Sequence, residues 1–563
     1  SFFLTLYFFF YLTLSLTYLG TVVSIEWATD GATDGATDWD RIERENEYVA
    51  PRTPSEETIA NIFAEVLNVK NVGIHDNFFS LGGHSLLATQ LISKLRVAFS
   101  SEIPLRTVFE SPTVAELEPI LTKTSASDKG LTLPQIQPRT GGEELPLSWS
   151  QERLWFLNEL EGSSSTYNIP GAISINGNLD IAALSQAVSE IVRRHEVLRT
   201  SFQTKDGKAI QVIHPPMTMN LDVVDLQSYK ETERYTLLKQ QAQLEADTPL
   251  NLEIAPLIRC QLLLVDTTEY VLLITMHHIV SDGWSTGVFI KELSSLYQAF
   301  STGEPSPLPE LPIQYGDFAI WQRQWLSGEV LENQLNYWVS ELEDAPELLQ
   351  LPTDYPRPSV QSYQGATQKW TLNTELTQKL QHLSRKSGTT LFMTLLAGFV
   401  TLLHRYTNQE DILIGSSIAN RNRSEIESLI GFFVNNLVLR THLEDNPSFE
   451  NLLQQVKETT LQAYEHQDVP FEQIVEAVQP QRSLAYSPLF QVMFDLHNAP
   501  ETQVELPDLT LGEVNQESAI AKFDLTVSVT ETDQELVCEW EYNTDLFDSS
   551  TIERMAAHYH NLL

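Results

Sequence analysis

Apolar positions between residues 50 and 123 recur at the spacing of α-helices and predict a small all-helical unit. The run TPSE, which begins at Thr53, has the spacing of a capping box with proline at the first helical position. A second helix is expected to begin at Ser85, after the loop NVGIHDNFFSLGG, and TVAELEPIL indicates a short closing helix. The apolar positions of the first helix are Ile59, Ile62, Phe63, Val66 and Leu67.

From residue 147 onwards the pattern changes, because helical stretches now alternate with continuous apolar runs. LDIAALSQAVSEIVRRH and FENLLQQVKETTLQAYEH have helical period, whereas LIRCQLLLV and YVLLITMHHIV are strand-length runs separated only by DTTE. ILIGSSIA and LVLRTHL are two further strand candidates. The proline-rich GEPSPLPELP, residues 303–312, predicts a connection between two lobes. The expected fold class is a small all-α helical bundle followed by a two-lobed α/β domain.

A chain of 563 residues has room for about three folding units. The stretch from TSASDKG to GGEE contains small residues, prolines and glycines and is typical of a linker. We therefore expect a segment outside any folded domain at 1–49, a helical domain at 50–123, a linker at 124–146, a first lobe at 147–310 and a second lobe at 311–563.

The first 24 residues carry no charge, and the exact repeat ATDGATDGATD follows at 28–38. The apolar run is long enough to span a bilayer, but it lacks the initiating Met and basic region of a signal peptide. It is open to three interpretations: a membrane anchor, a piece of an upstream domain, or translated sequence foreign to the native protein. We favour the third, because the run has neither helical nor strand period and adjoins an exact repeat.

Charge and cysteine usage narrow the classes of function. Lys and Arg number 35 against 75 Asp and Glu, a net charge of −40, so neither nucleic acid nor an anionic membrane is an expected partner. The two cysteines, Cys260 and Cys538, lie in apolar runs without a CxxC or Cys/His cluster. Neither a disulfide framework nor a metal site is expected, and two reduced thiols fit a cytoplasmic protein.

The run LGGHSLLATQL places Ser85 at the start of a helix, after two glycines that permit a tight turn. These residues alone are equally typical of an ordinary helix N-cap. The longer run DNFFSLGGHSLLATQLISKLR closely resembles a peptidyl carrier domain of nonribosomal peptide synthetases. The resemblance implies that Ser85 carries a 4′-phosphopantetheine arm, attached by a phosphopantetheinyl transferase. His84 is similar to the residue found in carriers that pass on an L-residue without epimerisation.

The run MHHIVSDGWS follows the expected strand YVLLITM and contains His277, His278, Asp282 and Gly283 in the pattern HHxxxDG. A histidine pair can be structural or bind a metal, but no third ligand stands at a standard spacing. The pattern is similar to that of condensation domains of the same synthetases, which have a chloramphenicol acetyltransferase-like fold. Six further stretches resemble motifs of this family in the same order: SWSQERLWFL, RRHEVLRTSF, YGDFAIW, IGFFVNNLVLR, HQDVPFE and RSLAYSPLFQVMF.

By this resemblance, His278 takes a proton from the attacking amine or orients it, and His277 is structural. A neutral imidazole suits either role, because its ordinary pKa is near 6.5. Gly283 leaves room for the substrate arm.

The resemblance also implies that Asp282 shapes the loop and pairs with an arginine from the other lobe. The best match for that arginine is Arg421 in SIANRNRSE, although Arg423 is close by. The family usually has glycine where this chain has Asn420.

The expected activity is that of an acyltransferase that forms a peptide bond between a thioester and an amine. The carrier precedes the condensation domain, so Ser85 is expected to hold the donor. The expected partners are an upstream adenylation domain, a downstream adenylation domain and an acceptor carrier. The sequences of the motifs resemble those of condensation domains that use an L-donor and an L-acceptor. An epimerisation domain shares the double histidine but not SWSQERLWFL, and a heterocyclising relative replaces HHxxxDG. A recruiting scaffold tends to lose the second histidine, which is present here.

Overall fold

The computed structural model describes residues 48–101, 103–127, 134–141, 144–444, 446–497, 506, 509–513, 520–532 and 534–563. The interpretation of segment 1–49 lies outside the described residues, apart from Tyr48 and Val49. The chain divides into two compact units, Ser1–Glu43 and Arg44–Leu563, and the fold below is that of the second.

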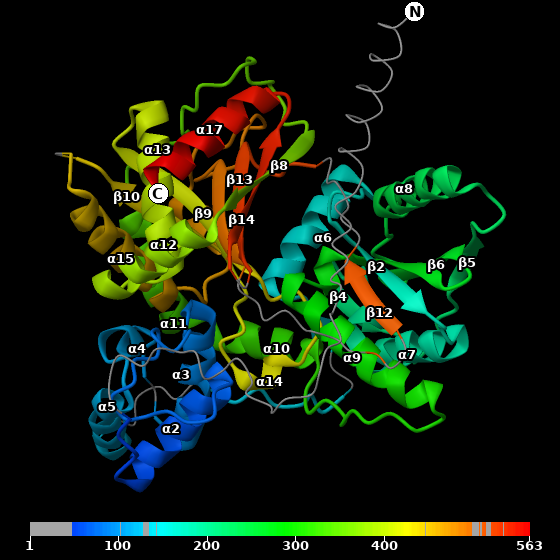
Figure 1. Cartoon of the computed structure of the whole chain (residues 1–563), viewed down its shortest axis with the longest axis horizontal. Coiled ribbons are helices and arrows are strands. Elements are labelled where there is room, and N and C mark those ends of the chain that lie inside the picture. The colour runs from blue at the N-terminus through cyan, green and yellow to red at the C-terminus, as the bar shows by residue number, and fades with distance from the viewer. Residues whose placement is uncertain are drawn as a thin grey trace, which may run out of the picture. The chain divides into compact units, whose positions relative to one another are not determined.

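The helical domain has four helices among the described residues (Figure 1): α2 Pro54–Leu67, α3 Ser85–Phe99, α4 Arg106–Glu110 and α5 Val114–Ser127. Half of the predicted capping box is present, because Thr53 Oγ1 accepts a hydrogen bond from the Glu56 amide at 3.1 Å, whereas the Glu56 carboxylate accepts from the Arg52 amide at 2.6 Å and not from Thr53. Phe63 of α2 packs edge-on against Phe78 of the loop, with ring centroids 5.3 Å apart. The closing helix is longer than predicted and takes in the start of the expected linker, because no glycine or proline interrupts 120–127.

The first lobe is built on a five-stranded sheet with the strand order β12-β2-β7-β6-β5. The predicted hairpin is confirmed, since β6 and β7 pair antiparallel. Helices α7 and α9 pack together against this sheet's core, in which β7 is almost wholly buried. The elements are β2 Asn168–Gly177, α7 Ile181–Arg194, β5 Asp222–Asp225, α8 Glu231–Asp247, β6 Ile258–Asp266, β7 Glu269–His277, α9 Gly283–Ser301 and β12 Leu509–Glu513.

The same lobe carries a small sheet with the order β1-β4-β3 and a helix, α6, that faces the second lobe. These elements are β1 Leu145–Pro146, α6 Trp149–Glu161, η2 Glu196–Arg199, β3 Thr200–Lys205 and β4 Lys208–Ile213.

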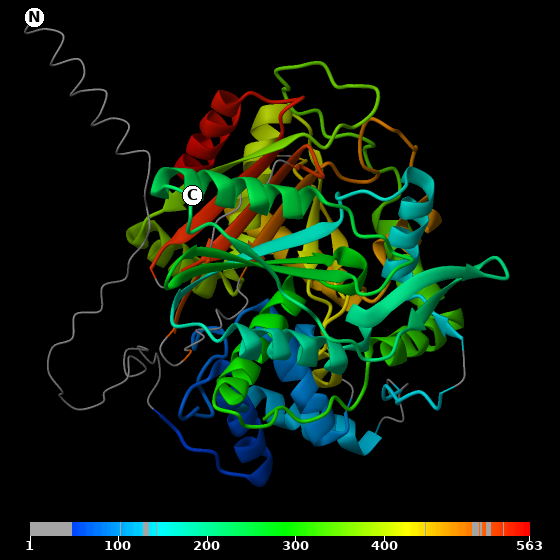
Figure 2. The same ribbon diagram turned by 90° about the vertical axis from the view of Figure 1, so that its right-hand side faces the viewer.

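The second lobe contains a six-stranded sheet with the order β10-β9-β11-β13-β14-β8, in which β11 runs parallel to both of its neighbours. Figures 1 and 2 show α17 beside this sheet, and α13 packs between α17, α15 and the sheet. The strands are β8 Gly365–Leu372, β9 Asp411–Ile418, β10 Asn435–His442, β11 Val492–His497, β13 Leu525–Glu531 and β14 Leu536–Asn543. The helices are α12 Thr374–Ser387, α13 Leu391–Thr407, α15 Phe449–Glu465 and α17 Ser549–Leu562.

Four further α-helices are α10 Tyr315–Trp325, α11 Gly328–Glu341, α14 Ser424–Glu427 and α16 Phe471–Val478. Among the described residues, no single helix has the length and apolar run needed to cross a bilayer. Only the pair α12 and α13, which is bent by 103°, meets that criterion by length and composition.

The predicted division between the lobes at residue 310 is too simple. Strand β12 lies far along the chain but pairs antiparallel with β2, with Leu509 opposite Gly177 and Glu513 opposite Ile173. Tyr315 of α10 also lies in the core of the first lobe. Local patterning cannot reveal such pairings, because they are decided by contacts between segments distant in sequence.

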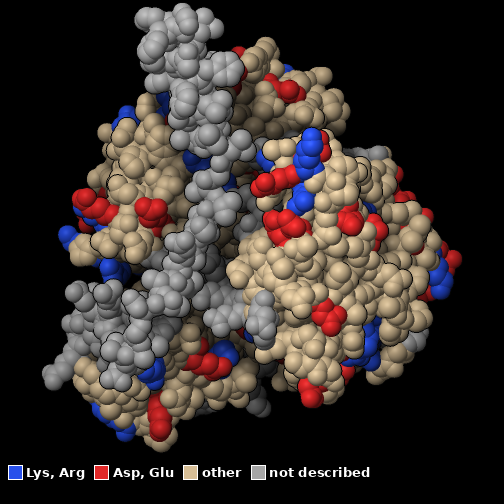
Figure 3. Space-filling model, turned by 45° about the vertical axis from the view of Figure 1, so that its right-hand side comes forward, with Lys and Arg blue, Asp and Glu red and all other residues tan. Residues whose placement is uncertain are grey.

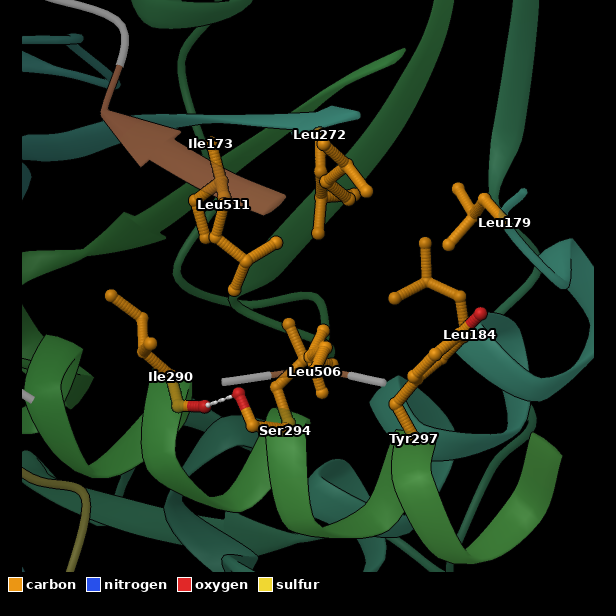
Figure 4. Close-up of a pocket in the computed structure, with 11 residues that line it drawn as sticks. Ile173, Leu179, Leu184, Leu272, Ile290, Ser294, Tyr297, Leu506 and Leu511 are labelled. Atoms are coloured by element: carbon orange, nitrogen blue, oxygen red, sulfur yellow. Dashed lines mark hydrogen bonds between the residues drawn. The ribbon is translucent and has the colours of Figure 1, made fainter. Parts of the chain in front are cut away.

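A small apolar pocket lies beneath β12 (Figure 4). Leu511 of β12, Ile173 of β2 and Leu272 of β7 line it on the side of the sheet, and Ser294 and Tyr297 of α9 line it from below. The Ser294 hydroxyl in this lining donates to the main chain of its own helix at 2.9 Å. Buried apolar side chains as well as strand pairing therefore hold β12 on the first lobe.

Candidate functional site

The HHxxxDG segment joins the end of a buried strand to the start of a long helix. β7 ends at His277, a single 3-10 turn covers His278–Val280, and α9 begins at Gly283. Asp282 caps α9, because its Oδ1 accepts from the Ser285 amide at 2.9 Å. A strand end and a capped helix thus fix the backbone on both sides of His278.

His277 points into the protein and is tied to the backbone. Its Nδ1 accepts from the Ile279 amide at 3.1 Å, and the residue pairs with Asn168 of β2. Burial above all, with smaller contributions from the charges of His278 and Lys522, lowers the pKa of His277 to about 3. A neutral ring whose Nδ1 is bonded to the backbone suits a structural role.

His278 lies where the two lobes meet. Its amide donates to the Tyr167 carbonyl at 2.8 Å, and its ring packs edge-on against Phe432, with centroids 4.7 Å apart. Its Nδ1 is buried and has no hydrogen-bond partner among the described residues. Burial, followed by the positive charge of Lys522, lowers its pKa to about 4, although Asp282 acts in the opposite direction. The ring is therefore neutral near pH 7 and able to accept a proton.

Asp282 is 2% exposed, and both of its carboxylate oxygens are satisfied. Its Oδ1 accepts from the Ser285 hydroxyl at 2.7 Å and from Arg421 Nη2 at 3.1 Å, and its Oδ2 accepts from the Phe433 amide at 2.9 Å. Burial alone would raise the pKa of Asp282, but Arg421 and these hydrogen bonds outweigh it and lower the pKa. The carboxylate is therefore a charged structural link between the lobes.

Arg421, and not Arg423, meets Asp282. Arg421 Nη1 also donates to the carbonyls of Ile426 and Leu429 at 2.6 and 2.7 Å. Arg423 instead lies 3.4 Å from a Glu425 oxygen. The guanidinium of Arg421 thus holds the loop that contains Asp282 in one lobe and the α14 turn of the other together.

The structure shows the backbone at Asn420 and the space around Gly283, two positions that the family motifs single out. Asn420 has φ +51°, in the left-handed region that glycine adopts without strain, and asparagine is among the residues that tolerate it. A Cβ built on Gly283 would meet nothing within 4 Å, so this position borders open space. The structure therefore leaves room beside Gly283.

Ser85 is the first residue of α3, but the capping residue is His84, whose Nδ1 faces the Leu87 amide at 3.5 Å. Gly82 has φ +97°, and a Cβ on Gly83 would lie 2.4 Å from the Phe78 ring, so the turn before Ser85 requires both glycines. The serine hydroxyl is therefore not used to cap the helix.

Ser85 is only partly accessible to solvent. The residue is half-buried, and its hydroxyl lies beside the Tyr464 phenol of α15, without a well-formed hydrogen bond. The reason is that the helical domain packs against the second lobe.

Two side chains of the helical domain, neither of which the sequence singled out, hold this contact. Arg106 donates to Glu465 at 2.9 Å and bidentately to Glu458 at 3.0 and 2.7 Å, both on α15. Ser93 Oγ accepts from the Ser424 amide of α14 at 3.0 Å. The contact is therefore made partly by charge, with the arginine contributed by the helical domain.

No His, Cys, Asp and Glu side chains of the described residues form a group of three able to hold a metal ion. On the face shown in Figure 3, acidic and basic side chains of the described residues are interspersed, which offers a phosphate backbone no continuous basic track. Lys522, which no sequence motif singled out, lies with its Nζ 5.6 Å from the centroid of the Tyr167 ring.

Comparison with known proteins agrees with this arrangement. The family described as "Phosphopantetheine attachment site" matches residues 57–118, and the family described as "Condensation domain" matches residues 142–563. The chain is 50% identical over 528 residues to one component of the linear gramicidin synthase of Brevibacillus parabrevis, covering 93% of this chain and 7% of that protein. It is 50% identical over 553 residues to another component of the same synthase, covering 98% of this chain and 11% of that protein.

Among solved structures, the X-domain from teicoplanin biosynthesis is similar, with a TM-score of 0.69 and 27% identity, covering 76% of this chain and 96% of that one. The chain spans about a tenth or less of the length of the curated relatives it matches. It covers most of the X-domain structure, which is a single domain.

Proposed function

This chain belongs to the Condensation domain family of nonribosomal peptide synthetases, with a phosphopantetheine attachment domain before it, and we propose that it transfers an acyl or peptidyl group from a thioester held on Ser85 to an amine on a second carrier domain. Condensation domains of this family catalyse amide bond formation, which is an acyltransferase reaction. The observation that carries the proposal is the neutral ring of His278 at the junction of the lobes.

The attachment domain carries 4′-phosphopantetheine covalently on a serine, and we assign that serine as Ser85. The residues present fit the group, because the Ser85 hydroxyl neither caps α3 nor forms a hydrogen bond. The start of a 15-residue helix also favours a phosphate. When bound, the arm supplies the thioester.

The chain's own residues supply a proton acceptor and a rigid frame. A ring nitrogen of His278 takes the proton that the attacking amine loses as the carbon–nitrogen bond forms and the carbon–sulfur bond breaks. Asp282 and Arg421 hold the loop that presents this ring, and His277 fixes the strand end. The rest of the acceleration is expected to come from holding donor and acceptor in line.

We further propose that Ser85 holds the donor and that the L-donor, L-acceptor class applies. The contact of α15 with the Ser85 region and the absence of an Asp at position 84 support this assignment. We place the carrier at 50–123, the linker at 124–146 and the two lobes at 147–310 and 311–563, with β12 crossing to the first. The partners are adjacent adenylation and carrier domains and a phosphopantetheinyl transferase. A cytoplasmic location is proposed because Cys260 and Cys538 are buried free thiols.

The test loads Ser85 with an arm that bears a dipeptidyl group, adds a separate aminoacyl carrier and follows both proteins by intact mass spectrometry. We expect the dipeptidyl mass to move from this chain to the acceptor, and Ser85→Ala to remain unloaded. Loading without transfer to any of a broad acceptor panel would instead favour a recruiting scaffold. Exchange of the donor α-hydrogen for solvent deuterium would favour epimerisation.

Reversing the charge of Arg106 is expected to slow transfer from the attached carrier about five-fold. Partly exposed ion pairs contribute about 0.2–1 kcal/mol each, and Arg106→Glu removes its contacts with Glu458 and Glu465. The measurement is single-turnover transfer at low and high salt, where the difference between variant and wild type should shrink as salt screens the charges.

Arg234→Glu is the matched control, because Arg234 is similarly exposed and paired but lies in the first lobe, at Asp266. If Glu458→Arg and Glu465→Arg together restore the transfer rate of the Arg106→Glu variant, the result would support docking of the carrier by charge. Equal slowing in Arg234→Glu would contradict it.

A further inference from the structure

Residues 430–433, with the sequence IGFF, follow α14 in the second lobe but pack into the first. They precede β10 and form neither helix nor strand. The side chains of Ile430, Phe432 and Phe433 are buried in the same hydrophobic cluster as the apolar residues of β7 and α9. This bridging segment, residues 430–433, is therefore part of the core of the first lobe.

Polar side chains in that core hold the main chain of each residue of the bridging segment. Breaking any of these buried hydrogen bonds would leave a polar group unsatisfied, which is costly. The backbone of the bridging segment is therefore fixed on the first lobe. The four hydrogen bonds are the Ile430 amide to His195 Nδ1 at 3.2 Å, the Gly431 amide to Ser285 Oγ at 3.0 Å, the Tyr315 hydroxyl to the Phe432 carbonyl at 2.7 Å, and the Phe433 amide to Asp282 Oδ2 at 2.9 Å.

Two of the side chains that hold the bridging segment are themselves held by further polar groups. Because His195 Nδ1 accepts from an amide, its proton is on Nε2, which lies 3.1 Å from a Glu292 oxygen. Glu292 in turn accepts from Arg194 at 2.9 Å. The Tyr315 hydroxyl lies 2.8 Å from that of Ser148. Residues of the motifs RRHEVLRTSF, SWSQERLWFL and YGDFAIW therefore all act on the bridging segment.

Phe432 is the residue of the bridging segment whose ring meets His278. The two ring centroids are 4.7 Å apart, with an angle of 61° between the ring planes, and Phe432 is 9% exposed. Phe433 instead packs against Tyr315 and Phe318, with centroids 5.0 and 4.8 Å apart. The fixed backbone thus places one aromatic ring edge-on against the histidine.

The imidazole of His278 lacks the usual means of orientation. A histidine that takes a proton is commonly oriented by a hydrogen bond on its other ring nitrogen. The Nδ1 of His278 is buried and forms no well-formed hydrogen bond with any described residue. Of the groups that shift the pKa of His278, the main-chain carbonyls of His278 and Ser281 act least. An edge-to-face aromatic contact also restricts how a ring can turn, because such pairs have a preferred geometry.

We propose that Phe432 is a positioning residue for amide bond formation: the bridging segment holds its ring edge-on against His278 and so fixes the orientation in which the imidazole meets the incoming amine. This inference rests on the proposed function. It adds a residue of the second lobe to the machinery that the HHxxxDG motif confines to the first. No bond or proton changes at Phe432 itself.

The first test measures single-turnover transfer by the full chain, loaded at Ser85, with Phe432→Leu, which keeps apolar bulk but removes the flat ring. We expect transfer to slow about ten-fold, the rate equivalent of a strong aromatic pair, with the half-saturating concentration of the acceptor carrier unchanged. In the His278→Ala background, Phe432→Leu should cause no further slowing, because the ring that it positions is gone. Slowing by the same factor in both backgrounds would overturn the proposal.

A second readout does not depend on activity. Carbon-13 relaxation of the His278 ring, in protein labelled at histidine and assigned with His278→Ala, should show a more mobile ring in Phe432→Leu. Phe392→Leu is the matched control, because Phe392 is 7% exposed and packs on Phe494 at 6.0 Å, within the second lobe. It should alter neither the His278 ring nor the transfer rate.

Urea unfolding of both variants separates positioning from stability, since each loses one buried aromatic contact and should be destabilised to a similar extent. An unchanged His278 ring in Phe432→Leu would overturn the proposal. A more mobile ring in this variant, in a protein whose wild type transfers nothing, would support positioning by Phe432 and count against the proposed function alone.

Discussion

Replacing His278 with alanine is expected to lower the rate of acyl transfer by about 10²–10⁴-fold while leaving the loading of Ser85 unchanged. The neutral ring at the lobe junction is the group that the attacking amine would use as proton acceptor, and alanine offers no acceptor. Loading takes place on α3 of the carrier domain and involves no residue of the β7–α9 segment. The variant therefore separates acyl transfer from the loading of Ser85.

Stability has to be measured beside activity, because the His278 ring also packs on Phe432. Removing it leaves a cavity, so thermal unfolding should move modestly downward. His442→Ala is the matched control, since His442 is 45% exposed at the end of β10 and should change neither quantity. With a His278 pKa of about 4, wild-type protein should show no titration of this group between pH 5 and 8. Transfer by His278→Ala at the wild-type rate would remove the ring from the mechanism.

Arg421→Met is expected to destabilise the condensation domain by about 3–5 kcal/mol at pH 8, the usual effect of removing one partner of a buried ion pair. Arg421 and Asp282 are 0% and 2% exposed as side chains, so water cannot take the place of the guanidinium. The variant also leaves the carbonyls of Ile426 and Leu429 without their donor. The measurement is the midpoint of the condensation-domain transition in urea.

The pH dependence of this effect has a definite sign. In wild type the pKa of Asp282 is lowered, so its contribution to stability is present above its unfolded pKa and is lost as pH falls through the folded value. In Arg421→Met, burial without the cation raises that pKa, so the destabilisation should be smaller at pH 5 than at pH 8. Asp282→Asn in the same background should recover part of the loss. Strictly additive effects of the two changes would contradict the pairing.

The local elements of this protein could be predicted because their causes are local. The capped helix at Thr53, the helix that begins at Ser85 and the β6–β7 hairpin each follow from period, caps or turns within a short window. The same holds for the strand before His278, because the apolar run YVLLITM forms β7. These features agreed with the structure because no distant contact competes with them.

The elements that the sequence did not reveal depend on distant partners. Strand β12 looks like any short apolar run until β2 is placed beside it. Arg106 and Lys522 look like ordinary surface cations until α15 and Tyr167 lie against them. The sequence around a charged residue does not show which distant segment will lie against it, because packing over hundreds of residues decides which segments meet.

The sequence by itself determined the order of the domains, the serine at the start of α3 and the histidine pair at the end of β7, because each is a short motif with its own structural cause. The tertiary structure alone decided that Arg421 rather than Arg423 meets Asp282, that Ser85 is half-buried against α15, and that a lysine stands over Tyr167. The physical reason is that the surroundings of a histidine decide whether its ring is neutral and able to accept a proton. Burial and the charges around His278 set its state, and they come from segments that only folding brings together.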